Sequence, residues 1–189
     1  MIHISNFRPV KRVTDVVDIF SKVAKHVPSK LLFVGEGPEL SKVIHQVKEL
    51  GLMEQVMFCG KQDDVAQIIS LADVMLLPSE KESFGLVALE AMACGVPTVG
   101  SNAGGIPELI THGETGYLAP VGDTDSMARY TVELLTDERK YRRFTEACLQ
   151  RARYTFCNNI ITSQYEDIYY RVLGRSVPEP QGLTKQCLG

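Results

Sequence analysis

The sequence predicts an α/β fold built around one mostly parallel sheet. Short apolar runs alternate with stretches of helical periodicity along the chain, and polar or glycine-rich turns follow the apolar runs. This alternation predicts a single Rossmann-like, doubly wound sheet. The 189 residues are enough for one good core but too few for two domains of this kind. We therefore expect one domain over residues 1–173 and a disordered tail over residues 174–189.

Three strand–helix units are expected in the first half of the chain. Each strand is a short apolar run, and turn residues separate it from a helix with one apolar face. In order, the units are strand 2–5 with helix 13–27, strand 30–34 with helix 39–50, and strand 56–59 with helix 65–71. The run at 30–34 is apolar throughout, which is typical of a parallel strand buried on both faces. Asp64 is placed to cap the helix that follows it.

The second half of the chain continues the alternation. In order, it contains strand 72–79 with helix 86–94, strand 97–101 with a glycine-rich loop at 102–108, a turn and short strand at 112–118, and helices 126–135, 138–156 and 160–173. Asp123 and Asp125 form an Asp-x-Asp pattern, which can bind a divalent metal. Because both aspartates open a helix, capping and the helix dipole account for them.

The central feature of the sequence is the loop at 82–85 with the helix at 86–94. The strand before the loop ends at Pro78, and Gly95 closes the helix. The helix is apolar on every side except at Glu90, so we expect it to be buried. A carboxylate in a buried helix carries a desolvation cost unless a hydrogen bond offsets it.

The start of this helix has the features of an anion site. The N–H groups of Gly85, Leu86 and Val87 lie at the positive end of the helix dipole, which suits phosphates. Glu82 and Glu90 flank that position and could accept hydrogen bonds from sugar hydroxyls of the same ligand. The alternative is that Glu82 caps the helix and Glu90 pairs with a buried cation. For one glutamate alone we would favour that alternative, but the pair around a glycine favours a binding site.

A basic loop follows the first strand. It contains Arg8, Lys11 and Arg12 in an otherwise acidic chain. Because the loop follows a strand, Arg8 and Lys11 could hold a diphosphate there. Arg8 would donate two parallel hydrogen bonds, and Lys11 would contribute a compact positive charge. The alternative is a solvated basic loop, which is the more common meaning of an isolated run of cations.

Another loop, Gly35-Glu36-Gly37-Pro38, follows the second strand. In α/β sheets, ligands bind at the carboxyl ends of the strands, where this loop lies. A Gly-x-Gly pattern alone is weak evidence, and a turn without a ligand is about equally consistent with it.

The motif Glu82-x7-Glu90 supports a family resemblance. With Phe84-Gly85-Leu86-Val87 inside it and Ala-Met-Ala-Cys-Gly-Val-Pro after it, the motif strongly resembles the donor-binding domain of retaining glycosyltransferases of family 4. The resemblance covers residues 1–173. It is nearest to family members that transfer N-acetylglucosamine from UDP to L-malate in bacillithiol biosynthesis.

The resemblance implies the C-terminal half of a two-domain GT-B enzyme. It implies a retaining, metal-independent transfer of a sugar, with UDP-N-acetylglucosamine as the donor and a small acceptor such as L-malate. No cofactor is implied. An N-terminal acceptor-binding domain is the expected partner, and it is absent from this chain.

The resemblance also implies roles for individual residues. Glu82, Lys11 and Arg8 are the expected catalytic group, with Glu82 positioning the donor sugar and the two cations stabilising the leaving diphosphate. The family lysine matches Lys11, whereas the usual arginine of the family aligns with Asn6 and not with Arg8. Further donor-binding residues are expected at Asn6, Gly35, Gly60, Lys61, Gln62, Ser83, Phe84, Gly85, Leu86, Val87 and Glu90. The last of these would bind the ribose, and the backbone around residues 60–62 would receive the nucleobase.

Two other functions stay open from the sequence. One is a stand-alone nucleotide-binding module that is inactive without the acceptor domain. The other, less favoured, is a related GT-B enzyme such as a sugar-nucleotide epimerase or a phosphorylase.

Composition excludes several further classes of function. A net charge of −3 and the absence of a long basic run argue against nucleic-acid binding. No apolar stretch approaches the roughly 20 residues of a membrane span. The five scattered cysteines predict reduced thiols in a cytoplasmic protein. No Cys/His cluster has the spacing of metal ligands.

Overall fold

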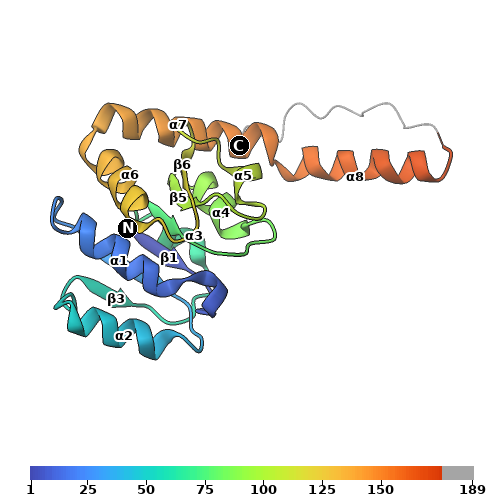
Figure 1. Ribbon diagram of the computed structural model, residues 1–189. Helices are drawn as coiled ribbons and strands as arrows, with labels where there is room; N and C mark the ends of the chain where they lie inside the picture. The colour runs from blue at the N-terminus through green and yellow to red at the C-terminus, as the bar shows by residue number, and fades with distance from the viewer. Residues whose placement is uncertain (176–189) are drawn as a thin grey trace.

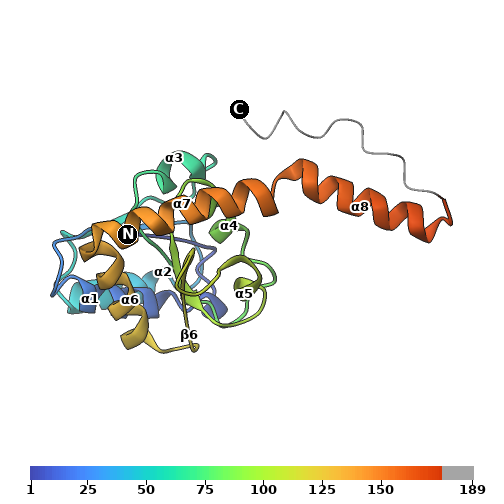
Figure 2. The ribbon, with the colours of Figure 1, turned by 90° about the horizontal axis from the view of Figure 1, so that it is seen from above.

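A six-stranded parallel sheet organises the chain, with helices on both of its faces (Figures 1 and 2). The computed structural model describes residues 1–175, and the predicted tail lies outside the described residues except for its first two. The strand order is β3-β2-β1-β4-β5-β6, and every neighbouring pair is parallel. This is the order of a doubly wound dinucleotide-binding sheet, so the predicted Rossmann-like fold is confirmed.

Each predicted strand and helix is present. The strands are β1 (Ile2–Ile4), β2 (Leu31–Val34), β3 (Val56–Phe58), β4 (Met75–Leu77), β5 (Thr98–Ser101) and β6 (Gly116–Ala119). The predicted helices are α1 (Val13–Val23), α2 (Leu40–Glu49), α3 (Val65–Ile69), α4 (Leu86–Ala93), α6 (Thr124–Thr136), α7 (Glu138–Thr155) and α8 (Asn158–Val172). Two short elements were not predicted: the 3-10 turn η1 (Pro9–Lys11) and α5 (Ile106–Leu109).

The predicted helix caps are confirmed where the structure tests them. The Asp64 carboxylate accepts a hydrogen bond from the Gln67 amide, and Asp123 accepts one from the Ser126 amide. Asp125 accepts a hydrogen bond from Lys22 Nζ at 2.5 Å. The Asp-x-Asp pattern is therefore explained by capping and ion pairing.

Two layers of helices enclose the sheet. Helices α1, α2 and α6 pack in one apolar cluster on one face, and α3 and α4 pack on the other. Helix α7 contacts both α4 and α6. The chain winds in opposite directions from the centre, where β1 lies beside β4. The helices after these two strands, α1 and α4, therefore lie on opposite faces, and the carboxyl edge between them is where such folds bind ligands.

Helix α4 departs from the sequence prediction, because it is not buried on all sides. Ala88, Ala91 and Met92 are buried, but Leu86 is 66% exposed and Glu90 is exposed. The two exposed residues are four positions apart and share one face. In the sequence, apolar residues occur on nearly every side of this helix. That pattern could not show which side the other described elements leave uncovered.

Three cysteines match the expectation of free thiols: Cys59, Cys94 and Cys148. Cys157 is disulfide-bonded, so the expectation of reduced cysteines is wrong there.

Helix α8 projects away from the body of the sheet (Figure 1) and has no buried residue. Across residues 1–175, each helix is too short or too polar to cross a bilayer.

Candidate functional site

A pocket of about 440 Å³ opens at the carboxyl edge of the sheet, where β1 and β4 lie side by side. It is lined by Ile4, Ser5, Asn6, Lys11, Glu82, Ser83, Phe84, Gly85, Leu86, Val87 and Glu90. Most of the residues expected from the sequence to bind a donor therefore lie together. Ile4 and Ser5 were not expected there, although their place at the end of a central strand could have indicated it.

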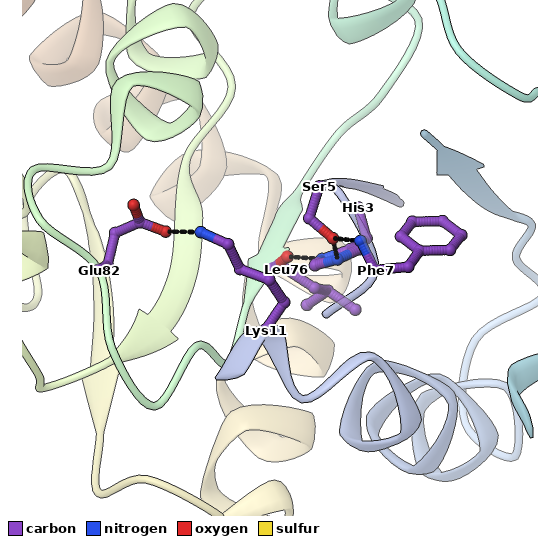
Figure 3. A network of polar contacts seen from close by, with 6 residues as sticks. All are labelled: His3, Ser5, Phe7, Lys11, Leu76 and Glu82. Atoms are coloured by element: carbon purple, nitrogen blue, oxygen red, sulfur yellow. Dashed lines mark hydrogen bonds and ion pairs between the residues drawn. The ribbon is translucent and has the colours of Figure 1, made fainter. Parts of the chain in front are cut away.

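An ion pair crosses this pocket. Lys11 Nζ lies 2.5 Å from Glu82 Oε2, and the two side chains are only 19% and 15% exposed (Figure 3). Lys11 ends the turn η1 after β1, and Glu82 lies in the loop after β4. The Glu80 amide donates a hydrogen bond to the Val10 carbonyl at 2.8 Å, which ties the same two loops together. The sequence assigned roles to both charged residues but did not predict that they pair.

The start of α4 is open. Gly85 is the N-cap residue, with a φ of 90°, and no side chain caps the helix. The alternative in which Glu82 caps the helix is therefore wrong. Among residues 1–175, no side chain accepts from the first-turn N–H groups of Leu86 and Val87, and both residues line the pocket. Free N–H groups at a helix start attract anions.

Glu90 faces the pocket from the second turn of α4. Partial burial raises the pKa of its carboxyl group. Within residues 1–175 its side chain makes no hydrogen bond or ion pair, so the buried-cation alternative is not observed. The carboxylate is consequently available to a ligand.

This placement gives an expected result for Glu90→Gln. Because the side chain reaches solvent and has no partner within residues 1–175, the free energy of unfolding without ligand should change by less than about 0.5 kcal/mol. UDP affinity should fall, because an amide accepts hydrogen bonds from ribose hydroxyls less strongly than a carboxylate does. Thermal melts with and without saturating UDP measure both effects. A large loss of stability in the ligand-free melt would contradict this assignment.

The glycine-rich loop after β5 supports the loop that carries Glu82. The Gly105 amide donates a hydrogen bond to the Glu82 carbonyl at 2.9 Å. A Cβ atom added at Gly104 would lie 2.0 Å from the Glu82 carbonyl oxygen, and one at Gly105 would lie 2.3 Å from the Ser83 carbonyl oxygen. The absence of both side chains lets the two loops pack backbone to backbone.

The glycines after β2 have a similar packing role. A Cβ atom at Gly35 would lie 1.9 Å from the Ser5 carbonyl oxygen, and one at Gly37 would lie 2.1 Å from that of Asn6. The Gly35 amide also donates to the Gly60 carbonyl at 2.7 Å. Close packing therefore accounts for the Gly-x-Gly pattern, and these glycines do not line the pocket.

Several of the expected donor-binding residues lie apart from the pocket lining. Gly60, Lys61 and Gln62 follow β3, and the Gln62 side chain donates to the Cys59 carbonyl at 2.7 Å. Their contact with a nucleobase stays a prediction.

Arg8 is also outside the pocket lining. It is exposed at the start of η1, and its guanidinium group makes no hydrogen bond or ion pair inside residues 1–175. Arg12 pairs with Asp15 at 2.6 Å. Among the pocket-lining residues, Lys11 is the cation that the basic loop contributes. The predicted phosphate contact of Arg8 stays untested.

Within residues 1–175, no group of three or more His, Cys, Asp or Glu side chains could hold a metal ion.

Known proteins resemble this chain in sequence. Residues 1–151 match the family described as Glycosyl transferases group 1. The chain is 54% identical over 173 residues to N-acetyl-alpha-D-glucosaminyl L-malate synthase of Bacillus anthracis, a match that covers 92% of this chain and 45% of that protein. The chain thus spans about half the length of this relative.

Solved structures share the fold. HepE of Anabaena in complex with UDP superposes with a TM-score of 0.84 at 27% identity, covering 90% of this chain and 48% of that one. A HepE structure in complex with UDP-glucose gives a TM-score of 0.83. The C-terminal domain of the group 1 glycosyl transferase LpcC of Francisella tularensis gives 0.75 at 26% identity, covering 82% of this chain and 85% of that one.

Proposed function

Because this chain belongs to the Glycosyl transferases group 1 family, we propose that it is the donor-binding part of a retaining, metal-independent glycosyltransferase. Its donor would be UDP-N-acetylglucosamine, and its acceptor a small molecule such as L-malate. One observation carries the proposal: Lys11, Glu82, Glu90 and the open start of α4 line a single pocket. The acceptor would bind to an N-terminal acceptor-binding domain of the whole enzyme.

The pocket chemistry supports transfer of a sugar from a diphosphate. Breaking the sugar–phosphate bond leaves negative charge on the diphosphate and positive charge at the anomeric carbon. Lys11 and the N–H groups of Leu86 and Val87 would stabilise the leaving diphosphate where a metal otherwise would. Glu90 would accept hydrogen bonds from the ribose.

The Lys11–Glu82 pair implies an exchange of partners when the donor binds. The diphosphate would take the Lys11 ammonium group, which in the free protein contacts Glu82. The Glu82 carboxylate would then accept hydrogen bonds from hydroxyls of the donor sugar. Glu82 would in this way place the sugar beside the leaving group without acting as a nucleophile.

The relatives support the donor and acceptor only by analogy. The relative with 54% identity is named for an N-acetylglucosaminyl and malate synthase reaction, and HepE was solved with UDP and with UDP-glucose. A stand-alone binding module is the second candidate. Assays of sugar transfer with and without an added N-terminal domain distinguish the two, because the module would stay inactive in both.

Lys11→Ala tests the diphosphate contact. Loss of a charge-assisted contact worth roughly 1.5–3 kcal/mol should weaken UDP binding by about ten- to a hundredfold. Because Glu82 would lose its partner, the free energy of unfolding of the variant should also fall. The calorimetric titrations should therefore be carried out well below its melting temperature. Lys48→Ala, an exposed charge on α2, is the matched control and should leave UDP affinity unchanged.

Two results decide this test. Glu82→Gln, which frees Lys11 from its carboxylate partner, should not weaken UDP binding but should weaken binding of the UDP-sugar. Unchanged UDP affinity in Lys11→Ala would place Lys11 in a purely structural ion pair.

A further inference from the structure

A buried histidine lies beneath the pocket. His3 is fully buried in the centre of β1, and its ring lies 5.8 Å from that of Phe33 and 6.1 Å from that of Phe7, between centroids. No role was predicted for this residue from the sequence. Its polar contacts, however, lead directly to the loop that carries Lys11 (Figure 3).

The hydrogen bonds of His3 fix its tautomer. Its Nδ1 lies 2.8 Å from the Leu76 carbonyl oxygen, and its Nε2 lies 2.8 Å from Ser5 Oγ. A carbonyl only accepts, so Nδ1 carries the proton, and the neutral ring then accepts at Nε2 from the Ser5 hydroxyl. Ser5 Oγ in turn accepts from the Phe7 amide at 3.2 Å.

This chain of hydrogen bonds lies where the sheet divides. β1 and β4 pair only at Ile2 and Met75, and one residue further on His3 bonds to the β4 backbone at Leu76. The loops that carry Lys11 and Glu82 begin beyond this point, where the two strands no longer pair. The imidazole therefore connects the two strands at the position where their backbone ladder ends.

The loop after β1 needs such support. Phe7 and Arg12, neither of them glycine, have φ values of 35° and 50°, a conformation that costs energy for side-chain-bearing residues. Phe7 is held by the Ser5 hydroxyl, by burial of its ring, and by the Glu39 amide, which donates to its carbonyl at 3.0 Å. Lys11 lies between the two strained positions.

We propose that His3 is a positioning residue for the nucleotide site: through Ser5 it holds the turn at Phe7, and that turn directs Lys11 to the diphosphate. This inference rests on the proposed function. Burial, and secondarily the positive charge of Lys11, lowers the pKa of His3 to about 4 despite the opposing effect of the Leu76 carbonyl, so the ring stays neutral and Nε2 stays an acceptor near neutral pH.

A double-mutant cycle between His3 and Lys11 tests the coupling. The amide of His3→Asn can replace the Nδ1 donor but is too short to reach Ser5, so UDP affinity should fall by about tenfold. In the Lys11→Ala background the same change should alter UDP affinity by less than about twofold. His3→Gln, whose amide reaches further, should retain more affinity than His3→Asn, and the exposed His26→Asn should retain all of it.

A second measurement keeps the inference separate from the proposed function. In His3→Asn the Phe7 amide should exchange its hydrogen at least about tenfold faster than in the original protein, with the Leu32 amide in the sheet as the unaffected reference. Equal losses of UDP affinity with and without Lys11, or unchanged exchange at Phe7, would overturn the role of His3. Failure of the unaltered protein to bind UDP would instead overturn the proposed function, and exchange at Phe7 would still decide whether His3 positions the loop.

Discussion

Gly104→Ala is expected to destabilise the fold by roughly 3 kcal/mol or more. Gly104 has a φ of +56°, and a Cβ atom there would lie 2.0 Å from the Glu82 carbonyl oxygen. The obstacle is backbone, so no side-chain rotation can relieve it. Either the loop at 102–105 or the loop that carries Glu82 must move, and folded protein that remains should bind UDP more weakly.

Gly51→Ala is the matched control for this result. Gly51 has a similar φ of +67°, but apart from its chain neighbours no atom of residues 1–175 lies within 4 Å of an added Cβ. The change should cost only the left-handed conformation, about 1–2 kcal/mol. Urea denaturation of the two variants gives the comparison. Equal losses of stability would show that the packing of the glycine-rich loop against Glu82 contributes nothing.

The second large effect is a dependence of stability on pH that originates at His3. An unfolded histidine binds a proton near pH 6.5, whereas the folded His3 has a pKa of about 4. Between these values the unfolded state binds more protons, so stability is fully present above pH 6.5 and falls as the pH decreases towards 4. The shift corresponds to a loss of about 3 kcal/mol across that window, levelling off below it.

Urea denaturation from pH 7.5 to 4 measures this loss. Three other histidines, His26, His45 and His112, are exposed, so the comparison with His3→Asn isolates the buried ring. The variant should lose most of the pH dependence between 6.5 and 4. A variant that keeps the full dependence would show that other groups cause it, and the neutral tautomer assigned to His3 would lose its support.

Much of the architecture followed from local patterns in the sequence. Short apolar runs at 30–34 and 97–101 gave buried parallel strands, and Asp64 and Asp123 gave helix caps, because each of these features depends on residues close in sequence. A pocket lies at the loop before α4, where the motif around Glu82 predicts a donor site, and binding of a donor there stays a prediction.

Features that depend on distant contacts were not predictable. The Lys11–Glu82 pair joins residues 71 positions apart, and no local pattern encodes that distance. The same is true of the open face of α4 and of the contact between His3 and the β4 backbone. Arg8 is a case in which a local pattern suggested a contact that the free protein does not prepare. Its charge and its closeness to Lys11 in sequence suggested a phosphate contact, but the turn η1 leaves Arg8 outside the pocket lining.

The central claim is a metal-independent UDP site at the carboxyl edge of the sheet, and calorimetric titration of this chain with UDP in EDTA tests it most directly. The account predicts saturable binding in EDTA, no gain on adding magnesium, and weaker binding in Lys11→Ala. Absence of binding in EDTA, with recovery in magnesium, would contradict it.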